Sequence, residues 1–242
     1  MQGQSEELRP FPAPKAWEYR WLQDELVPLC DPVGEDIRYD HTAGHPFDGT
    51  DQRKWLEAHL TGSACYGHTS LVPAFCAGYT AVSGREAVAA HIAKGSTQIA
   101  DWLPATAGFE FLLKKASAAQ RATKAEHTYF VWLQGESDAL AGNGKDYYLE
   151  KLLILEQALR KELKIDLFGI IRVGRFTGDG RDDAIIDAQR EACRRKGFLM
   201  LSEQTETAPL NPKVKGHFSA AGLQQIGLDA GRSLGEYRNF YE

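Results

Sequence analysis

The sequence predicts an α/β protein, a three-layer α/β/α sandwich of the flavodoxin-like type with a mostly parallel sheet of four or five strands. Two observations lead to this prediction. From about residue 70 onward, stretches with helical periodicity alternate with short apolar runs, which is the pattern of βα units. The chain has 242 residues, 43% of them hydrophobic, which is enough for one well-packed core. We therefore expect a single domain spanning residues 1–242.

The βα pattern fills residues 66–242. Strands are expected at "EAVAAHIA", whose alanines also suit a helix, and at "HTYFVWLQ", "DLFGIIRVG" and "FLMLSE". Ser219 is a suitable N-cap for the final helix. Helices are expected from Thr69 to Val82, from Phe109 to Ala125, over "KDYYLEKLLILEQALRKEL", from Arg181 to Lys196 and from Ser219 onward.

Residues 1–65 have a different character. They are rich in proline, contain Trp17, Trp21 and Trp55, and show no clean period. We expect long irregular connections around the active site, lying over the strand ends, with one short helix around Asp51 to Leu60.

Composition excludes several classes of protein. The net charge of −5 without a basic block argues against nucleic acid or an anionic membrane as a partner. The four cysteines are too few for a disulfide framework, which favours a reduced compartment, although a Cys65–Cys76 bridge stays open. No apolar run approaches the roughly 18 residues of a membrane span, and no export signal is present. The chain is expected to be soluble, cytoplasmic if complete and extracellular or virion-associated if excised from a larger protein.

The stretch "VWLQGESDAL", residues 131–140, shows where a ligand would bind. An apolar run, read as a buried strand, ends directly in Gln134, Glu136 and Asp138. In a parallel sheet the carboxyl ends of the strands meet at one edge, and ligands bind there. These side chains are therefore expected at a binding edge.

Four motifs together resemble a known family. "GQS" near the start, "KGSTQIADW", "VWLQGESDA" and "GHFSAAGLQQIG" are similar in order and spacing to the sialate O-acetylesterase and family 6 carbohydrate esterase group of SGNH hydrolases. The resemblance covers nearly the whole chain. It implies an SGNH-type sandwich and a serine esterase that removes O-acetyl groups from a carbohydrate without a metal or cofactor. An O-acetylated small molecule or polysaccharide would be its partner.

The resemblance also implies site residues. Ser5 stands at the position of the nucleophile, and His217 at that of the general base. Gly95 stands where the family offers a backbone N–H to the oxyanion hole, and Gln134 where it offers a side-chain amide. The Ser5 N–H would be the third donor.

The chemistry of such a site explains these residue types. A serine hydroxyl is a weak nucleophile and needs a base within hydrogen-bond reach, for which an imidazole is suited. The tetrahedral intermediate places negative charge on one oxygen, and preformed donors stabilise it by about 2.7 to 4 kcal/mol each. A strand can end in Gln because a neutral amide donor is held rigidly there.

Each residue also has an interpretation without catalysis. Ser5 alone would be a surface residue near the N-terminus, His217 a helix-start histidine and Gly95 a turn glycine. Gln134 could satisfy a loop, and Glu136 and Asp138 could cap the loop before Tyr147.

Other motifs point to other sites only weakly. His41 and His45 have metal-like spacing, but the Gly and Pro beside them argue against a helix and hence against zinc. Glu136 and Asp138 are too close in sequence to flank a glycosidic bond. "GRFTGDGRDD" lacks the Lys-Ser/Thr of a P-loop.

Three features depart from the family pattern. Only two residues precede Gly3, so either the first strand of the sheet is missing or the sequence begins inside a longer protein. Glu6 follows Ser5 where the family usually has Asn. Val214 stands where the family commonly has the Asp that orients the histidine.

The departure at Val214 leaves the third catalytic group open. We weigh a Ser–His dyad with a backbone carbonyl as acceptor against Glu136, Asp138, Glu203 and Glu206, and choose Glu136 among the side chains. A rival hypothesis for the whole chain is a carbohydrate-binding or assembly module that keeps the fold without catalysis.

Overall fold

The strands form two small sheets in the computed structural model, which describes residues 9–21, 23–31, 33, 69–93, 97–212 and 216–241. Each sheet has three strands. The strands are β1 (Ala16–Arg20), β2 (Glu25–Pro28), β3 (Ala87–Ala89), β4 (Tyr129–Trp132), β5 (Leu167–Ile171) and β6 (Phe198–Ser202). The helices are α2 (Val72–Ser83), α3 (Ala107–Thr123), α4 (Glu136–Ala141), α5 (Lys145–Leu163), α6 (Arg181–Ala192) and α7 (Ala220–Tyr241), with 3-10 turns η1 (Ile99–Trp102) and η2 (Gln204–Glu206).

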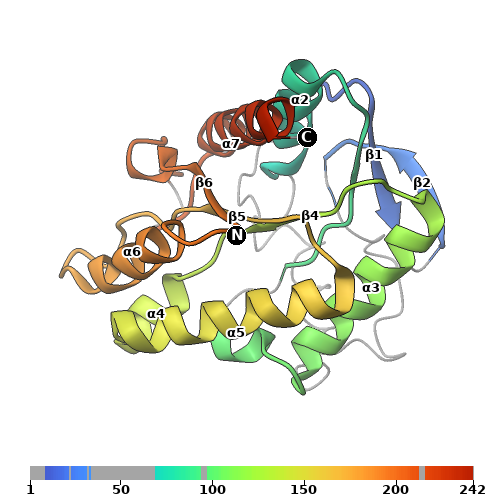
Figure 1. Ribbon diagram of the computed structural model, residues 1–242. Coiled ribbons are helices and arrows are strands. Elements are labelled where there is room, and N and C mark those ends of the chain that lie inside the picture. Colours follow the sequence, from blue (N-terminus) through green and yellow to red (C-terminus); the bar gives the residue numbers. More distant parts are fainter. Residues whose placement is uncertain are drawn as a thin grey trace, which may run out of the picture.

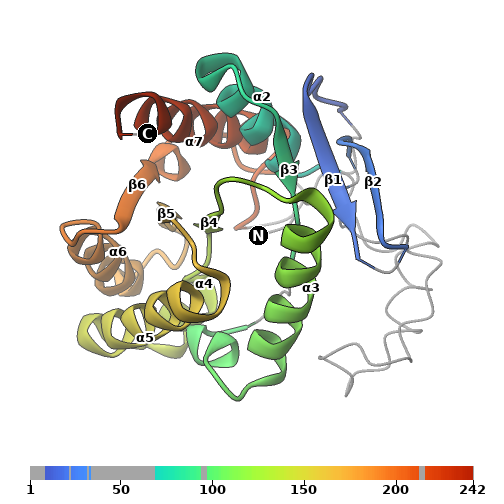
Figure 2. The same ribbon diagram turned by 45° about the vertical axis from the view of Figure 1, so that its right-hand side comes forward.

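The larger sheet has the order β4-β5-β6 and is entirely parallel. The smaller sheet has the order β2-β1-β3, with β1 parallel to β3 and antiparallel to β2. Figure 2 shows the two sheets as separate groups of strands. The prediction of an α/β fold with mostly parallel strands is confirmed, and the described strands form two sheets of three strands where one sheet of four or five was expected.

Helices cover the larger sheet on both faces, as the sandwich prediction requires. Helices α2 and α7 lie on one side of β4, β5 and β6, and α3 to α6 lie on the other (Figure 1). Strand β5 is buried along its whole length and serves both layers. Leu167 and Ile171 pack toward α7, while Phe168 and Ile170 belong to the core under α5 and α6. This alternation is the two-residue period of a strand.

Most predicted elements from residue 69 onward are present. The helix over "KDYYLEKLLILEQALRKEL" is observed as Lys145–Leu163, and the short β3 lies within "EAVAAHIA". Ser219 caps α7, because its Oγ accepts a hydrogen bond from Gly222 N at 3.1 Å. Helix α4 and turn η1 were not predicted.

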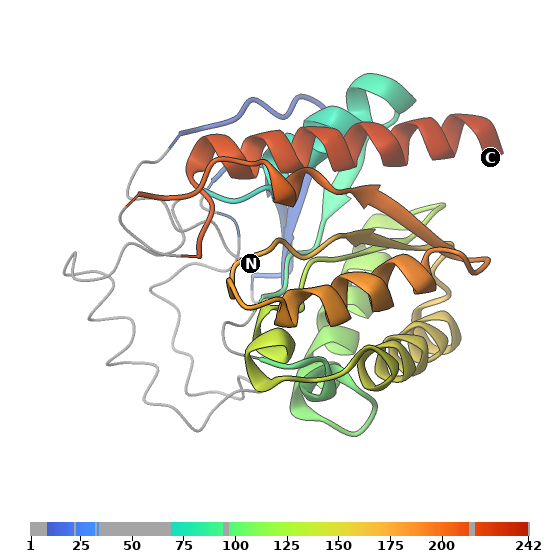
Figure 3. The same cartoon turned by 90° about the vertical axis from the view of Figure 1, so that its left-hand side faces the viewer.

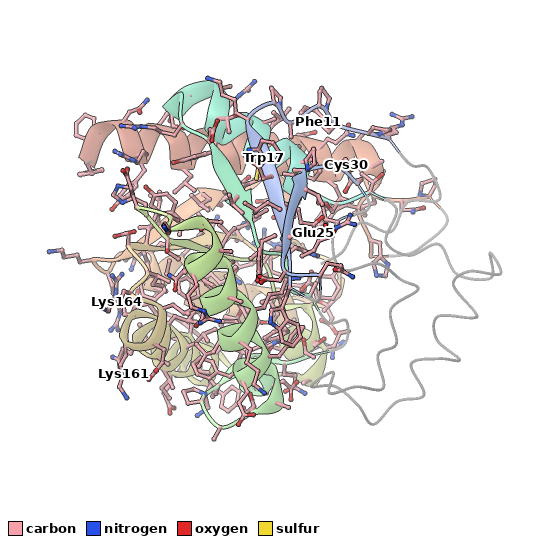
Figure 4. The ribbon with its side chains drawn as sticks, turned by 90° about the vertical axis from the view of Figure 1, so that its right-hand side faces the viewer. Phe11, Trp17, Glu25, Cys30, Lys161 and Lys164 are labelled. Atoms are coloured by element: carbon pink, nitrogen blue, oxygen red, sulfur yellow. The ribbon has the colours of Figure 1, made fainter. Side chains whose placement is uncertain are left out.

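Residues 16–28 correct the prediction of irregular chain. They form β1 and β2, a hairpin-like pair whose outer surface carries Trp17 and Glu25 (Figure 4). Five-residue and four-residue strands are too short to show a reliable period in sequence, and Pro28 stands only at the end of β2. The helix expected around Asp51 to Leu60 lies outside the described residues.

Helices α2 and α7 run side by side and approach closely. A Cβ atom at Gly231 of α7 would lie 1.9 Å from Phe75 O of α2, so only glycine permits this approach. The contact places the first turns of α2 and α7 on the same side of the molecule.

Two further predictions can be compared with the structure. Cys76 is a buried free thiol, so it does not form the bridge to Cys65 that the sequence left open. Within the described ranges, no helix is both long and apolar enough to cross a membrane.

Candidate functional site

The carboxyl ends of β4, β5 and β6 share one edge of the larger sheet. Gln134 follows β4 on this edge, Arg172 and Val173 follow β5, and Glu203 follows β6. Helices α4 and α7 both begin on this side of the molecule (Figure 3). This edge is therefore the expected location of the predicted site residues.

The structure describes three of the five predicted site residues. Gln134, Glu136 and His217 are described, whereas Ser5 and Gly95 lie outside the described residues, as does Val214. The described part of the candidate site therefore comprises the end of β4, the segment that begins at Thr97, and the residues before α7.

Gly135 makes the turn between β4 and α4. Its φ of 144° is in the region that side chains avoid. A Cβ atom there would also lie 2.7 Å from Ile185 Cγ2 of α6. The glycine of "QGESD" is thus needed for conformation and for packing, and it brings Gln134 and Glu136 to the two sides of one tight turn.

The Gln134 side chain is buried and its amide is completely hydrogen-bonded. Nε2 donates to Asp138 Oδ2 at 2.6 Å and to Thr97 O at 3.0 Å. Oε1 accepts from the Tyr148 hydroxyl at 3.0 Å. A ligand that received a hydrogen bond from Nε2 would have to replace one of the two present acceptors.

Asp138 joins the segment before η1 to the turn after β4. Its carboxylate is fully buried, and Oδ2 accepts from Ile99 N at 2.9 Å as well as from Gln134. Oδ1 accepts from Asn143 Nδ2 at 2.7 Å, and the same Nδ2 donates to Gln98 Oε1 at 3.1 Å. The "STQI" and "QGESD" motifs, distant in sequence, are therefore held against each other.

Tyr148 of α5 and Gln189 of α6 also form hydrogen bonds with Gln134, in the turn after β4. Gln189 Nε2 donates to Gln134 O at 2.8 Å, and Gln189 Oε1 accepts from Val173 N at 2.8 Å. The Tyr148 hydroxyl accepts from Trp132 Nε1 at 3.1 Å. Burial raises the pKa of the Tyr148 phenol far above its ordinary value of 10.0, so this hydroxyl keeps its proton.

Glu136 differs from Asp138. It is the first residue of α4 and only partly buried, yet its Oε1 is inaccessible to solvent and has no hydrogen-bond partner in the described part of the chain. A carboxylate oxygen in that state has an unused acceptor, which costs free energy unless a donor meets it.

The other acidic candidates are engaged with arginines. Glu203 Oε2 lies 2.6 Å from Arg190 and 3.4 Å from Arg172. Glu206 bridges Arg172, at 2.8 Å, and Arg175, at 2.9 Å. The hydrogen bond from Arg190 lowers the pKa of Glu203. We call these five residues, Arg172, Arg175, Arg190, Glu203 and Glu206, the arginine–glutamate cluster.

His217 lies in the chain that returns from β6 to α7. Its carbonyl accepts from Asn211 N at 2.7 Å, and the next residue, Phe218, pairs with Leu210. A Cβ atom at Gly174, just past β5, would lie 3.6 Å from Phe218 Cζ. These contacts place the His217 backbone beside the ends of β5 and β6.

Sequence reasoning missed Tyr148 and Gln189. Tyr148 reads as an ordinary member of the apolar face of α5. Gln189 carried a signal, because it is a polar residue four positions after Ile185 and three before Ala192 on the buried stripe of α6. No group of three or more His, Cys, Asp or Glu side chains among the described residues is arranged to hold a metal ion.

Comparison with known proteins adds a family and a fold. A family model described as carbohydrate esterase, sialic acid-specific acetylesterase, matches residues 69–234, a range that contains Gly95, Gln134, Glu136 and His217 but not Ser5. None of the curated proteins matches the chain significantly. The X-ray structure of a protein from Arabidopsis thaliana is similar, with a TM-score of 0.70 and 16% identity over 97% of this chain and 84% of that chain. At this identity the likeness shows the fold alone.

Proposed function

We propose that this chain, which belongs to the sialic acid-specific acetylesterase family of carbohydrate esterases, removes O-acetyl groups from a carbohydrate through an acetyl-serine intermediate. Membership indicates an esterase acting on a carbohydrate. The serine mechanism and the roles of individual residues are our proposal.

One observation carries the proposal. The segment that begins at Thr97 is docked on the turn after β4, through Gln134 Nε2 to Thr97 O and Ile99 N to Asp138 Oδ2. The resemblance assigns one oxyanion donor to this turn, the Gln134 amide, and another to the N–H of Gly95, which stands two positions before Thr97 in the sequence. The contact between Thr97 and Gln134 supports a site to which both donors contribute.

The reaction proceeds in two halves. Ser5 Oγ attacks the acetyl carbon while His217 takes the hydroxyl proton, and the carbonyl oxygen becomes an oxyanion that accepts from the Ser5 N–H, Gly95 N–H and Gln134 Nε2. Collapse breaks the bond to the sugar oxygen, which leaves with the proton from His217. Water then attacks the acetyl-serine, His217 takes its proton and returns it to Ser5, and acetate leaves.

Glu136 is our choice for the acceptor that orients His217. Among the described residues its carboxylate has no hydrogen-bond or ion-pair partner, whereas Asp138, Glu203 and Glu206 are all engaged. A free acceptor at the site edge suits the role of holding one imidazole nitrogen. The alternative is a dyad in which a backbone carbonyl accepts that hydrogen bond.

A fluorophosphonate probe tests the serine mechanism, because it labels only an activated serine. We expect the label on Ser5, and expect Ser5→Ala to abolish both labelling and acetate release from aryl acetates and O-acetylated sugars. Ser137→Ala, which changes a serine of α4, is the matched control and should keep both. Label on Ser63, Ser83 or Ser96 would overturn the assignment, and an unlabelled, inactive wild-type protein would favour the non-catalytic carbohydrate-binding module.

Single alanine substitutions identify the third group. Glu136→Ala should lower kcat by about 10³-fold or more if Glu136 orients His217. Alanine at Asp138, Glu203 and Glu206 provides the comparison. A fall below about 10³-fold in all four variants would leave the dyad, and high residual activity of His217→Ala would refute the mechanism.

A further inference from the structure

We infer that Asp138, Tyr148 and Gln189 are positioning residues that lock the Gln134 amide in one orientation, with its NH₂ group toward the segment at Thr97. We call these three residues the amide clamp. The inference rests on the proposed function, in which that amide meets the oxyanion, but the orientation itself can be measured without any reaction.

Asp138 determines the nitrogen side of the amide. Its Oδ2 is a pure acceptor and lies 2.6 Å from Gln134 Nε2, so it holds one of the two amide hydrogens. The carboxylate cannot turn away, because Ile99 N and Asn143 Nδ2 donate to it as well. The second amide hydrogen is donated to Thr97 O at 3.0 Å, so a ligand oxygen receives it by taking the place of that carbonyl.

Tyr148 determines the oxygen side. Trp132 Nε1 and Gln189 Nε2 can only donate, and they lie 3.1 and 3.3 Å from the phenolic oxygen. The hydroxyl therefore accepts from these groups and has one hydrogen for Gln134, whose Oε1 and backbone O lie 3.0 and 3.1 Å away. Because Gln189 Nε2 already donates to that backbone O at 2.8 Å, we assign the hydroxyl hydrogen to Oε1. A flipped amide would place its NH₂ against a donor and its oxygen against the Asp138 carboxylate, which makes two repulsive contacts.

Gln189 holds the backbone that carries the amide. It reaches from α6 to Gln134 O with its Nε2 and to Val173 N with its Oε1, at 2.8 Å each. Gln189 is itself fully buried. Gln189 thus links the chain after β4 to the chain after β5, and these two hydrogen bonds fix the position of the Gln134 backbone.

The clamp explains how a flexible side chain can serve as an oxyanion donor. Once a ligand oxygen has replaced Thr97 O, an amide that is held in one orientation needs no further reorganisation when charge develops, which is the condition for strong transition-state stabilisation. Loss of the clamp should therefore affect kcat more than KM, since the ground-state ester carries little charge.

The first experiment is a double-mutant cycle on the purified full chain. Tyr148→Phe keeps the ring and removes the donor, and Asp138→Asn replaces an acceptor oxygen by a donor. We expect kcat to fall about 10-fold and about 100-fold respectively, with KM changed less than about two-fold. In a Gln134→Ala background both substitutions should change kcat by less than about two-fold, because they act through Gln134.

Asp182→Asn is the matched control for Asp138→Asn. Asp182 is also buried and also accepts three hydrogen bonds, from Phe176 N, Thr177 N and Thr177 Oγ1, but it does not contact Gln134. We expect it to lower thermal stability comparably and to keep kcat. Equal losses of kcat in Asp138→Asn with and without Gln134 would overturn the inference.

The second experiment reads the amide directly by NMR of ¹⁵N-labelled protein. The Gln134 side-chain N–H signals, assigned with Gln134→Ala, should exchange slowly with solvent and should become fast in Asp138→Asn. Exchange in wild type as fast as that of the exposed Gln157 would overturn the clamp. Should the wild type hydrolyse no ester, the proposed function fails while this measurement still decides the clamp.

Discussion

Two polar clusters on the same sheet edge are built in opposite ways. At the end of β4, the amide clamp and Gln134 form a buried network of neutral groups around one carboxylate, Asp138. At the ends of β5 and β6, the arginine–glutamate cluster consists of ion pairs whose two carboxylates are 41% and 48% exposed. Only its central guanidinium, Arg172, is fully buried.

The difference shows which end of the edge is suited to chemistry. Ion pairs between long, half-exposed side chains are weakly directional and are screened by salt. Buried hydrogen bonds between planar groups specify an orientation and lose their partners at high cost. This difference supports our proposal that transition-state stabilisation takes place at the β4 end, and we propose a mainly structural role for the β5 and β6 ends.

The largest expected effect is a loss of kcat at the β4 end of the edge. Gln134→Ala should lower kcat by about 10²-fold to 10³-fold with little change in KM, because an oxyanion donor acts in the transition state. Steady-state kinetics on an aryl acetate measures this. Glu206→Gln, in the arginine–glutamate cluster, should keep kcat within about two-fold. A variant of Gln134 that changes only KM would make it a substrate-binding residue.

The next effect is a loss of stability when the arginine–glutamate cluster is disrupted. Arg172→Met should lower the free energy of unfolding by about 3 kcal/mol, the lower end for breaking a buried ion pair, since both glutamates can still reach solvent and a second arginine. Urea unfolding measures it. Arg194→Met, at a guanidinium that is 76% exposed, is the control and should cost less than about 0.5 kcal/mol. Equal stability of the two variants would remove the structural role.

Asp31, a buried carboxylate outside both clusters, sharpens the comparison. Asp31, like Asp138, has hydrogen-bond donors and no cation in the described part of the chain: Ser70 N and Oγ donate to Oδ1 at 2.9 and 2.8 Å. Burial raises its pKa from 3.8 to about 6 in spite of these bonds. The folded protein therefore binds this proton more tightly than the unfolded chain, and the free energy of unfolding falls as the pH rises from about 4 to about 6.

Asp31→Asn removes this pH dependence, because the amide oxygen still accepts from Ser70 and carries no charge. We expect the variant to be more stable than wild type by about 3 kcal/mol at pH 7.5 and to match it near pH 3.5. Thermal unfolding as a function of pH measures both. A stability difference that is the same at both pH values would show that Asp31 does not titrate in this range.

The smallest effect distinguishes the clusters by salt. Glu206→Gln should cost about 0.5 kcal/mol at low ionic strength and less in 1 M NaCl, because its ion pairs with Arg172 and Arg175 are half-exposed. The cost of Tyr148→Phe, measured in the same urea titrations, should not depend on salt. Salt dependence in the tyrosine variant instead would mean that charge, not hydrogen bonding, stabilises the β4 end.

Strong periodicity made the larger elements predictable. The sequence predicts the bounds of the helix over residues 145–163 correctly, because its apolar stripe is long. It also predicts the start of α7, because Ser219 has a side chain suited to capping a helix. The strands of residues 16–28 were missed, since they are stabilised by pairing with each other and with β3 and carry no period of their own. Pairing partners distant in the chain leave no mark on a short strand.

The α/β class, a strand shortly before Gln134 and the family could be predicted from the sequence, because periodicity and motif spacing are local properties of the chain; the strand itself ends at Trp132. The tertiary structure alone decided that Asp138 joins Ile99 to Gln134 and that Gln189 crosses from α6 to the same turn. It also decided that Glu203 and Glu206 are bound to arginines, while Oε1 of Glu136 has no hydrogen-bond partner among the described residues. Whether a buried polar atom has a partner depends on groups that folding brings together, from 39 residues apart for Ile99 and Asp138 and 55 for Gln189 and Gln134, and no local pattern contains that information.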